Sequence, residues 1–434
     1  MNWFCFFDMV DSYLAFPALT LFLATGLILT FQTRFIQFRS FGRFIRIISG
    51  GPKEDHDSNI KTVSPYKALF TAMAGTIGMG NMVGPTVAIL MGGPGALFWL
   101  VFYSLISCVT KYAEVSFALH TRGKTEKGQI LGGPAQYLKL ISNNLANWYG
   151  FVTIFLFAGW SGLQTNTLAE ILVNEGVVPW VTGISLSAVV LIVLIGGVQR
   201  VGSFTTKLVP IMFFLYVSFS LTILFYDPFA LWAAIKLMFR YALTPAAPIG
   251  GFIGASLFSA VRIGTHHAAY ITECGVGTSS IAHSFSDVKR ISDQAIMAMY
   301  SVFADTFLCL ISGLVVLITG LWQQCGFTST MTYQAFSAYS PYYGKYILVM
   351  SVIFFVITTL IGNTFNGSRS FASFSKYRFM NFYYLFSAIV IFFGALVPVP
   401  LVWKIMDVVL VLVAIPHLVG LLMIAWHYPK MLKE

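Results

Sequence analysis

The sequence predicts an all-α polytopic membrane protein of about eleven transmembrane helices, two of them broken by glycine clusters. Of its 434 residues, 57% are hydrophobic and 10% are charged, and the mean hydropathy is +0.79. Soluble domains carry about 25% charged residues, so lipid is the expected outer solvent. In lipid the backbone must satisfy its own hydrogen bonds, which leaves helices or a closed barrel. The apolar runs are about twenty residues long, which suits helices and not barrel strands of roughly ten.

The remaining composition argues against several other classes of protein. The formal net charge of +10 is interpreted as marking the cytoplasmic face, so no nucleic-acid partner is expected. The five cysteines are scattered without ligand spacing, so neither a disulfide framework nor a metal cofactor is expected. Residues 1–12 contain no Lys or Arg, so the first span is expected to be retained and not cleaved as a signal peptide.

Eleven apolar runs between polar breaks are the expected spans. They lie near residues 14–32, 68–91, 94–119, 149–173, 180–196, 206–226, 250–274, 295–321, 345–366, 380–397 and 402–426. Two further stretches, Leu231–Leu243 and Ala335–Tyr343, are too polar or too short to span and are expected to be surface helices or loops. The inner loop Thr33–Tyr66 is interpreted as a solvated linker that contacts lipid.

The basic residues orient these spans. With the N-terminus outside, the inner segments hold 20 Lys and Arg residues and the outer loops hold 4. Because cytoplasmic loops are enriched in Lys and Arg, we predict an external N-terminus and a cytoplasmic C-terminus. The expected location is the plasma membrane, the inner membrane of a bacterium.

The second span is interrupted by the run Gly75–Asn81, which has glycines at 75, 78 and 80. Each glycine weakens a helix by about 1 kcal/mol relative to alanine. Close helix packing explains a few glycines, but it does not explain why Thr76 and Asn81 lie among them. Unwinding explains both features, because freed carbonyls can hold a cation and a new helix N-terminus can hold a carboxylate.

The seventh span carries the second cluster. It enters through Gly250, Gly251 and Gly254 and later contains the run Glu273–Ser280, with glycines at 275 and 277. With the first span set aside, the two breaks lie in the first and sixth of ten spans. Matching glycine-interrupted spans indicate an inverted-repeat transporter.

This pairing of breaks sets the expected domain organisation. Residues 1–434 form one transmembrane domain. An extra N-terminal span and its cytoplasmic loop occupy 1–67, a first five-helix repeat 68–226, and a second, inverted repeat 227–426.

Polar residues within the spans are candidates for function. Lys111 and Glu114 are three apart and share a helix face, so they either pair or share a polar cleft, unless Lys111 reaches to the inner surface. Gln164 and Asn166 in the fourth span either bond a neighbouring helix or line a solute cavity.

Ionisable and hydroxyl groups deep in spans add further candidates. Glu273 adjoins the second glycine break and is interpreted as functional, whereas Asp305 is open to a packing role through Thr306. The adjacent Thr358 and Thr359 lie mid-span in the ninth, where they either bond their own helix or offer oxygens to a sodium ion.

These residues resemble the alanine or glycine:cation symporter family, the sodium:alanine symporters. The resemblance covers most of the chain and is strongest from about 68 to 210. It is carried by Gly75-Thr76 with Gly78 and Gly80-Asn81, by Gly92-Gly93-Pro94-Gly95-Ala96-Leu97-Phe98-Trp99, by Thr110-Lys111-Tyr112-Ala113-Glu114, by Gly132-Gly133-Pro134 with Tyr137, by Gln164 with Asn166, and by Lys207-Leu208-Val209-Pro210.

The resemblance implies a LeuT-type fold and sodium-coupled uptake of alanine or glycine, without a cofactor beyond the coupling ion. The residues it implies for the amino-acid site are Thr76, Gly78, Gly80, Asn81, Gln164 and Asn166, and the second break adds Glu273 and Gly275. The sodium ligands it implies are the carbonyls of Ala74 and Ile77 and the hydroxyls of Thr358 and Thr359.

Two runs depart from the family pattern. Where the family reads Lys-Arg-Gly-Leu-Phe-Ser-Asn-Glu-Ala-Gly, this chain reads His266-His267-Ala268-Ala269-Tyr270-Ile271-Thr272-Glu273-Cys274-Gly275. Where the family reads Gly-Trp-x-Tyr-Tyr-Gly-Glu, it reads Gly362-Asn363-Thr364-Phe365-Asn366-Gly367-Ser368. These changes bear on substrate identity and on the coupling ion.

The leading hypothesis is a symporter, not an enzyme, which imports a small neutral amino acid with Na⁺. A proton-coupled or altered-substrate permease of the same fold is the alternative, because histidines titrate near neutral pH. A channel is a remoter alternative, since no filter motif or charge ring is evident. So is a membrane-embedded enzyme built on His266, His267 and Glu273, which have spacings of roughly one helix face.

Overall fold

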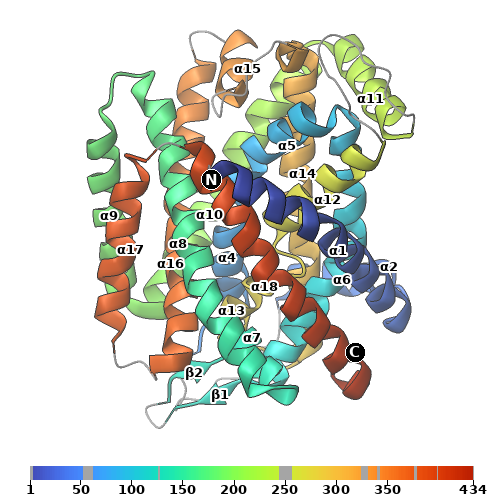
Figure 1. Ribbon diagram of the computed structural model, residues 1–434, viewed down its shortest axis with the longest axis vertical. Helices are drawn as coiled ribbons and strands as arrows, with labels where there is room; N and C mark the ends of the chain where they lie inside the picture. Colours follow the sequence, from blue (N-terminus) through green and yellow to red (C-terminus); the bar gives the residue numbers. More distant parts are fainter. Residues whose placement is uncertain are drawn as a thin grey trace.

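The computed structural model describes residues 3–51, 62–125, 128–243, 257–323, 331–339, 343–375, 379–397 and 399–433. The chain folds into a bundle of long helices with short helices at both ends (Figure 1). In the first part the helices are α1 (Trp3–Gln32), α2 (Ile36–Arg39), α3 (Phe41–Gly50), α4 (Pro65–Thr76), α5 (Met79–Gly92), α6 (Gly95–His120), α7 (Pro134–Tyr137), α8 (Asn143–Val173), α9 (Pro179–Ile195), α10 (Gly197–Tyr226) and α11 (Pro228–Leu243).

The second part of the chain is also helical. Its helices are α12 (Leu257–Thr272), α13 (Ser279–His283), α14 (Ile291–Thr319), α15 (Met331–Tyr339), α16 (Gly344–Ser375), α17 (Met380–Gly394) and α18 (Val399–His427). Two short antiparallel strands, β1 (Gly123–Lys124) and β2 (Ile130–Leu131), form a hairpin in which Gly123 pairs with Leu131.

Helices occupy all eleven predicted ranges, although 250–256, with Gly250, Gly251 and Gly254, lies outside the described residues. Within the described part, six helical segments are long and apolar enough to cross a membrane, namely Pro65–Gly92, Gly95–His120, Gly197–Tyr226, Ile291–Thr319, Gly344–Ser373 and Ile405–His427. Three shorter apolar helices are Phe16–Gln32, Pro179–Ile195 and Met380–Gly394. The exact number of spans and the repeat stay predictions.

The short helices gather at the two ends of the bundle. Helices α11 and α15 lie at one end, and the hairpin, α7 and the C-terminus lie at the other (Figure 1). The stretches Leu231–Leu243 and Ala335–Tyr343 were expected to be surface helices or loops, and α11 and α15 are the helices that occupy them.

The turn between α5 and α6 illustrates how the sequence positions neighbouring helices. Gly93 has a φ of 75°, a conformation that glycine adopts readily. Two residues later, a Cβ on Gly95 would lie 2.4 Å from the carbonyl oxygen of Tyr241, so only glycine allows α11 to approach this closely. The Gly-Gly-Pro-Gly run therefore sets the packing at this end of the bundle.

The interior is built by helices that are distant in sequence. Helix α8 packs along α16, α6 packs against α12 and α14, and α4 contacts α10, α13 and α16. Their contacts bury three apolar clusters, which surround the two glycine breaks. The breaks therefore lie deep in the bundle, away from its outer faces.

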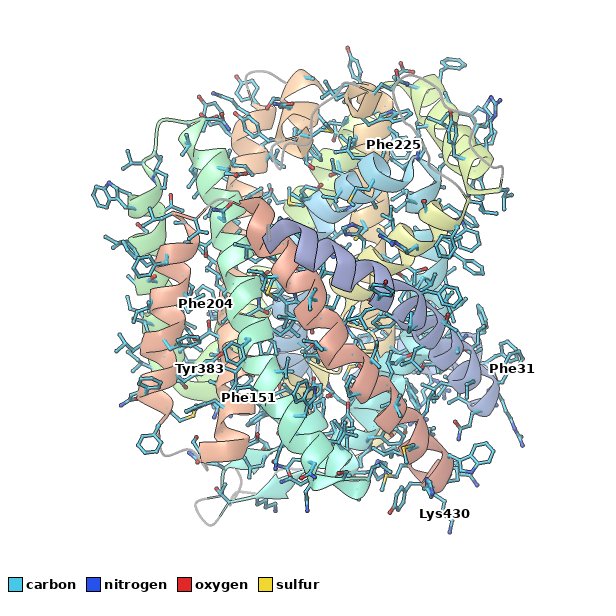
Figure 2. All side chains as sticks on the ribbon, viewed as in Figure 1. Phe31, Phe151, Phe204, Phe225, Tyr383 and Lys430 are labelled. Carbon is cyan, nitrogen blue, oxygen red and sulfur yellow. The ribbon has the colours of Figure 1, made fainter. Side chains whose placement is uncertain are left out.

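The outer faces of the bundle are apolar. Large side chains such as Phe31, Phe151 and Phe225, which are 65%, 55% and 65% exposed, project from the helices (Figure 2). Exposed apolar surface on this scale is stable in contact with lipid and not with water. Together with the long apolar helices, this surface identifies a multi-pass membrane protein.

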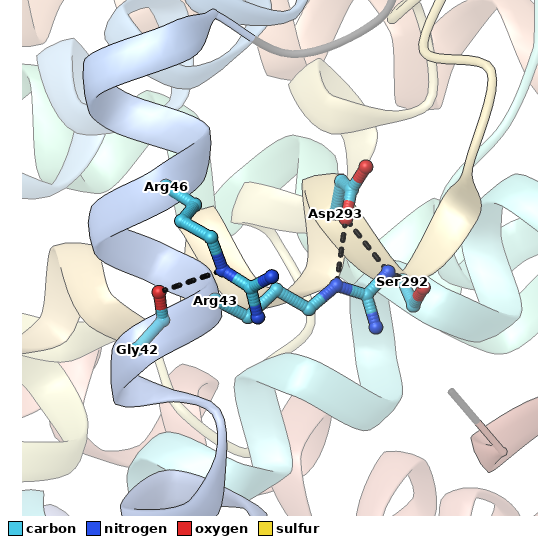
Figure 3. A network of polar contacts seen from close by, with 5 residues as sticks. All are labelled: Gly42, Arg43, Arg46, Ser292 and Asp293. Carbon is cyan, nitrogen blue, oxygen red and sulfur yellow. Dashed lines mark hydrogen bonds and ion pairs between the residues drawn. The ribbon is translucent and has the colours of Figure 1, made fainter.

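The described part of the segment after the first span contains the helices α2 and α3, although the sequence was interpreted as a linker there. Its helix α3 is held to the start of α14 by Arg43, whose Nε and Nη2 donate to Asp293 Oδ1 at 2.9 and 2.7 Å (Figure 3). Nη2 also donates to Ser292 Oγ at 2.6 Å. An acidic residue in the first turn of a helix is favourable, so Asp293 serves both α14 and the contact with α3.

Candidate functional site

The first break separates α4 from α5 at Ile77 and Gly78, within the predicted run. Gly78 is extended, with φ −149° and ψ −161°, so the helix cannot continue through it. Its amide donates to Asn81 Oδ1 at 2.9 Å, and the amide of Met79 donates to Gln164 Oε1 on α8 at 2.9 Å. Two amides that would otherwise continue the helical ladder are therefore bound by side chains.

This redirection leaves backbone groups at the break without partners. Within the described part of the chain, the carbonyls of Ala74, Gly75 and Thr76 accept no hydrogen bond, and the amide of Gly80 donates none. Carbonyl oxygens are suitable ligands for a hard cation. A free amide in the first turn of α5, at the positive end of its dipole, is suited to a carboxylate.

The predicted sodium ligands are partly gathered at this break. The Thr359 hydroxyl on α16 donates to the Ile77 carbonyl at 2.9 Å. One turn further along α16, a Cβ on Gly362 would lie 3.0 Å from the carbonyl carbon of Ala74, so the two backbones are in close contact. Thr358 points elsewhere, because adjacent helical residues are about 100° apart, and its hydroxyl lies 3.2 Å from the sulfur of Met212 on α10.

Gln164 and Asn166 on α8 also point in different directions. Gln164 binds the first break, but the Asn166 amide donates to the carbonyls of Gly394 and Val397, at 3.0 and 2.6 Å, at the end of α17. Residues two apart do not share a helix face, so α8 cannot direct both amides at the same site. In this structure Asn166 lies apart from the break.

The second break runs from Glu273 to Thr278, between α12 and α13. Glu273, Gly275 and Gly277 have φ values of 56°, 91° and 84°. These left-handed conformations are ordinary for the two glycines but strained for Glu273, and such strain persists only where the surroundings hold it.

Side chains from three other helices hold the second break. Glu114 Oε1 on α6 accepts from the Gly275 amide at 2.8 Å, and His417 Nδ1 on α18 lies 2.8 Å from the Gly275 carbonyl. The hydroxyl of Tyr149 on α8 donates to the Val276 carbonyl at 2.7 Å. Side chains from α6, α8 and α18 therefore fix the backbone of the second break at Gly275 and Val276.

Ionisable side chains are buried between the two breaks. Lys111 on α6 is 1% exposed, and it lies in the same buried region as the carboxyl groups of Glu114, Glu273 and Asp305. These carboxylates are at most 2% exposed. The hydroxyl of Thr76, at the first break, donates to Asp305 Oδ1 at 3.3 Å. One buried lysine among three carboxylates leaves an excess of acidic groups beside the break.

The histidine pair forms no catalytic cluster with Glu273. His266 Nε2 on α12 lies 3.1 Å from Asp407 Oδ1 on α18. The His267 ring packs edge-on against the His266 ring. Glu273 lies beyond the end of α12, where the helical spacing no longer applies. Among the described residues, no group of three His, Cys, Asp or Glu side chains is placed to hold a metal ion.

Comparison with known proteins decides the family. The model of the sodium:alanine symporter family matches residues 3–434. This chain belongs to that family. The resemblance noted in the sequence is thereby confirmed over nearly the whole length.

Relatives agree with this membership. The sodium/alanine symporter AgcS of Methanococcus maripaludis is 31% identical over 439 residues, which cover 98% of this chain and 95% of that protein. The probable sodium/glutamine symporter GlnT of Bacillus subtilis is 25% identical, over 94% of this chain and 85% of that protein. The names of these relatives differ in the amino acid carried.

Solved structures show the fold of this sodium:alanine symporter family member. A Na⁺-coupled sialic acid symporter in a substrate-bound outward-open state has a TM-score of 0.58 at 12% identity, over 89% of this chain and 82% of that one. A manganese transporter of Eremococcus coleocola has a TM-score of 0.57 at 13% identity, over 88% and 86%. At these identities the likeness concerns the helical transporter fold alone.

Several residues of this family member that organise the breaks were not identified from sequence. Asp305 was open to a packing role, yet its backbone carbonyl accepts from Asn81 and its carboxylate from Thr76. Tyr149 and His417 carried no signal, because an aromatic or a lone histidine in a span is common in helix packing. The feature that could have indicated them is that each is a polar group deep in an apolar run of the sequence.

Proposed function

We propose that this chain is a secondary active symporter that imports a small neutral amino acid, alanine or glycine, together with Na⁺. The observation that carries the proposal is the first break, where, among the described residues, three carbonyls at the end of α4 and the Gly80 amide at the start of α5 have no hydrogen-bond partner. Membership of the sodium:alanine symporter family supports the same conclusion.

The amino acid is proposed to bind at the start of α5. Its carboxylate would meet the amide of Gly80, where the helix dipole is positive. Asn81 and Gln164 already accept from the neighbouring amides of Gly78 and Met79, so they hold the backbone open. A carboxylate that competes with Gln164 for the Met79 amide would gain a second donor.

The cation is proposed to bind between α4 and α16. The carbonyls of Ala74 and Ile77 and the hydroxyl of Thr359 supply oxygen ligands that a hard cation prefers. Thr358 joins this set when its hydroxyl turns from Met212, so we propose that ion binding recruits it. The ligand groups come from α4, the first break and α16, and an ion that links them would couple the motion of these segments.

Proton coupling is the second candidate, and one observation favours it. Three carboxyl groups, those of Glu114, Glu273 and Asp305, are buried in the same region as Lys111. If all three are ionised, their negative charge exceeds the positive charge of this lysine. Either a bound cation or a bound proton would reduce this excess. Transport driven by a pH gradient in the absence of Na⁺ would favour the proton.

The orientation follows from the basic residues. We propose an external N-terminus and a cytoplasmic C-terminus in the plasma membrane, with α11 and α15 outside. Alternating access is proposed to arise when the helices with the free first break move against those that hold the second break.

Ligand-induced thermal stabilisation of the purified protein tests this function without transport. If Na⁺ and the amino acid bind cooperatively, each should raise the melting temperature more in the presence of the other, because binding linkage is reciprocal. Alanine and glycine are expected to stabilise the protein in Na⁺ and weakly or not at all in K⁺. Equal stabilisation in both salts would remove Na⁺ from the proposal.

A further inference from the structure

Three polar side chains converge on Gly75, just before the first break. A methyl group on Gly75 would lie 3.6 Å from Asn366 Nδ2, 3.9 Å from Asn363 Oδ1 and 3.9 Å from Glu273 Oε1. These are ordinary contact distances, so the three groups lie together against the Gly75 face of α4. Two of them come from α16 and one from the second break.

The two asparagines at this place are buried and have no hydrogen-bond partners. Asn363 and Asn366 are each 1% exposed. The Oδ1 of Asn363 and both amide atoms of Asn366 lack a partner among the described residues. Leaving a buried polar group unpaired costs about 1–3 kcal/mol. Two of these atoms, Asn363 Oδ1 and Asn366 Nδ2, face the same place beside Gly75, which indicates a ligand that pairs with them.

The positions of these asparagines depart from the family pattern. The run Gly362–Ser368 has Asn363 where the family pattern has tryptophan and Asn366 where it has tyrosine. Two rings are therefore replaced by smaller amides. The exchange gives volume to the site and replaces apolar contact with hydrogen-bonding capacity, so it suits a larger and more polar substrate side chain.

The unpartnered atoms define the chemistry of that side chain. Asn363 Oδ1 and Glu273 Oε1 are acceptors, and Asn366 Nδ2 is a donor. A primary carboxamide presents two N–H donors and one carbonyl acceptor. A metal cation or an ammonium group pairs only with the acceptors and leaves the Asn366 donor unpaired.

We propose that Asn363, Asn366 and Glu273 form a subsite for the carboxamide side chain of the transported amino acid. The inference rests on the proposed function and extends it, since it adds glutamine to the alanine and glycine proposed for the same transport site. The carboxamide nitrogen donates to Asn363 and Glu273, and its oxygen accepts from Asn366.

The distance along α16 between Thr359 and Asn363 distinguishes glutamine from asparagine, the two amino acids with a carboxamide side chain. Thr359, which marks the level of the break through its bond to Ile77, is four residues before Asn363, a rise of about 6 Å. The glutamine side chain spans about 5 Å from Cα to its amide nitrogen, and asparagine is shorter by one bond of about 1.5 Å. Glutamine therefore fits the subsite better than asparagine.

The experiment compares glutamine with molecules of the same shape. Purified protein is titrated in Na⁺ with glutamine, with glutamate, and with homoleucine, the hydrocarbon isostere of glutamine; binding is read from thermal stabilisation. Inhibition of labelled alanine uptake into proteoliposomes gives a second readout. Because a site built on hydrogen bonds discriminates against isosteres that lack them, glutamine should bind at least about tenfold more tightly than either.

Asn363→Leu and Asn366→Leu assign that preference to the subsite. Neither replacement removes a hydrogen bond within the protein, so neither should lower the melting temperature. Each should reduce the ratio of glutamine to homoleucine affinity to near one. Asn381→Leu, at an exposed asparagine on α17, makes the same exchange outside the site and should leave the ratio unchanged.

The outcomes separate this inference from the proposed function. Na⁺-driven alanine uptake with equal affinity for glutamine and homoleucine overturns the subsite and leaves the function standing. A glutamine preference that survives both leucine variants overturns the assignment to Asn363 and Asn366. Glutamine binding that the variants abolish, in a protein that transports no amino acid under any gradient, supports the subsite and overturns the function.

Discussion

Replacement of the buried lysine, Lys111→Met, is expected to destabilise the protein by about 3–5 kcal/mol, the typical effect of leaving buried charge without a compensating group. Methionine keeps most of the volume but leaves Glu114, Glu273 and Asp305 without the cation with which they interact. The measurement is the apparent melting temperature of the purified protein.

Two companion variants make this expectation specific. Lys139→Met alters an exposed lysine whose amine contacts only Gln136 in the described structure, at 3.2 Å, and should change stability by less than about 0.5 kcal/mol. Adding Glu114→Gln to Lys111→Met should recover part of the loss, because it removes one unpaired charge. A Lys111→Met protein as stable as the Lys139→Met protein would contradict the electrostatic account.

The second large effect is expected from Gly78→Ala. The added Cβ would lie 2.4 Å from Thr359 Oγ1 and 3.1 Å from Gln164 Nε2. Gly78 is extended, a conformation open to alanine, so the effect comes from space and not from backbone strain. The methyl displaces Thr359 from the Ile77 carbonyl and Gln164 from the Met79 amide.

Loss of these two hydrogen bonds at about 1 kcal/mol each should lower the initial rate of uptake by roughly 10- to 100-fold. The control is Gly80→Ala, because a Cβ there meets only Ile271, at 3.8 Å, and its amide is retained. We expect a much smaller loss for Gly80→Ala. If the two variants lost a similar fraction of their uptake rate, steric crowding at Thr359 would not be the cause of the loss in Gly78→Ala.

The position of the first break was predictable because its signal is local. The glycines of Gly75–Asn81 lower helix propensity, and Asn81 is the side chain that accepts from the Gly78 amide. A residue that interacts with its own neighbours three positions away can be recognised from the sequence of that segment alone. The same reasoning located Glu273 and Gly275 at the second break.

What the sequence could not provide was the partners from other helices. Nothing near Tyr149 or His417 indicates that α8 and α18 bring them to the Gly275 and Val276 carbonyls. The sequence also did not predict how each helix is rotated about its own axis. This rotation determines that Thr359, and not Thr358, contacts the Ile77 carbonyl at the end of α4. It likewise determines that Gln164, and not Asn166, contacts the first break.

The two breaks therefore differ in a way that sequence spacing did not reveal. The second is held by side chains from three other helices, Glu114, Tyr149 and His417. At the first, among the described residues, three carbonyls at the end of α4 accept no hydrogen bond, and the Gly80 amide donates none. Carbonyl oxygens suit a hard cation and an amide at a helix N-terminus suits a carboxylate, which is the physical basis for placing the ion and the amino acid at the first break.

The most direct test of the symporter account is uptake of labelled alanine and glycine into proteoliposomes that carry an inward Na⁺ gradient. The account predicts accumulation above the external concentration, which collapses when the Na⁺ gradient is removed. It also predicts no accumulation by Asn81→Ala, a variant that should stay folded because the hydrogen bonds that it loses, with the Gly78 amide and the Asp305 carbonyl, are few. Uptake that ignores the gradient, or uptake by Asn81→Ala at the rate of the unmodified protein, would contradict it.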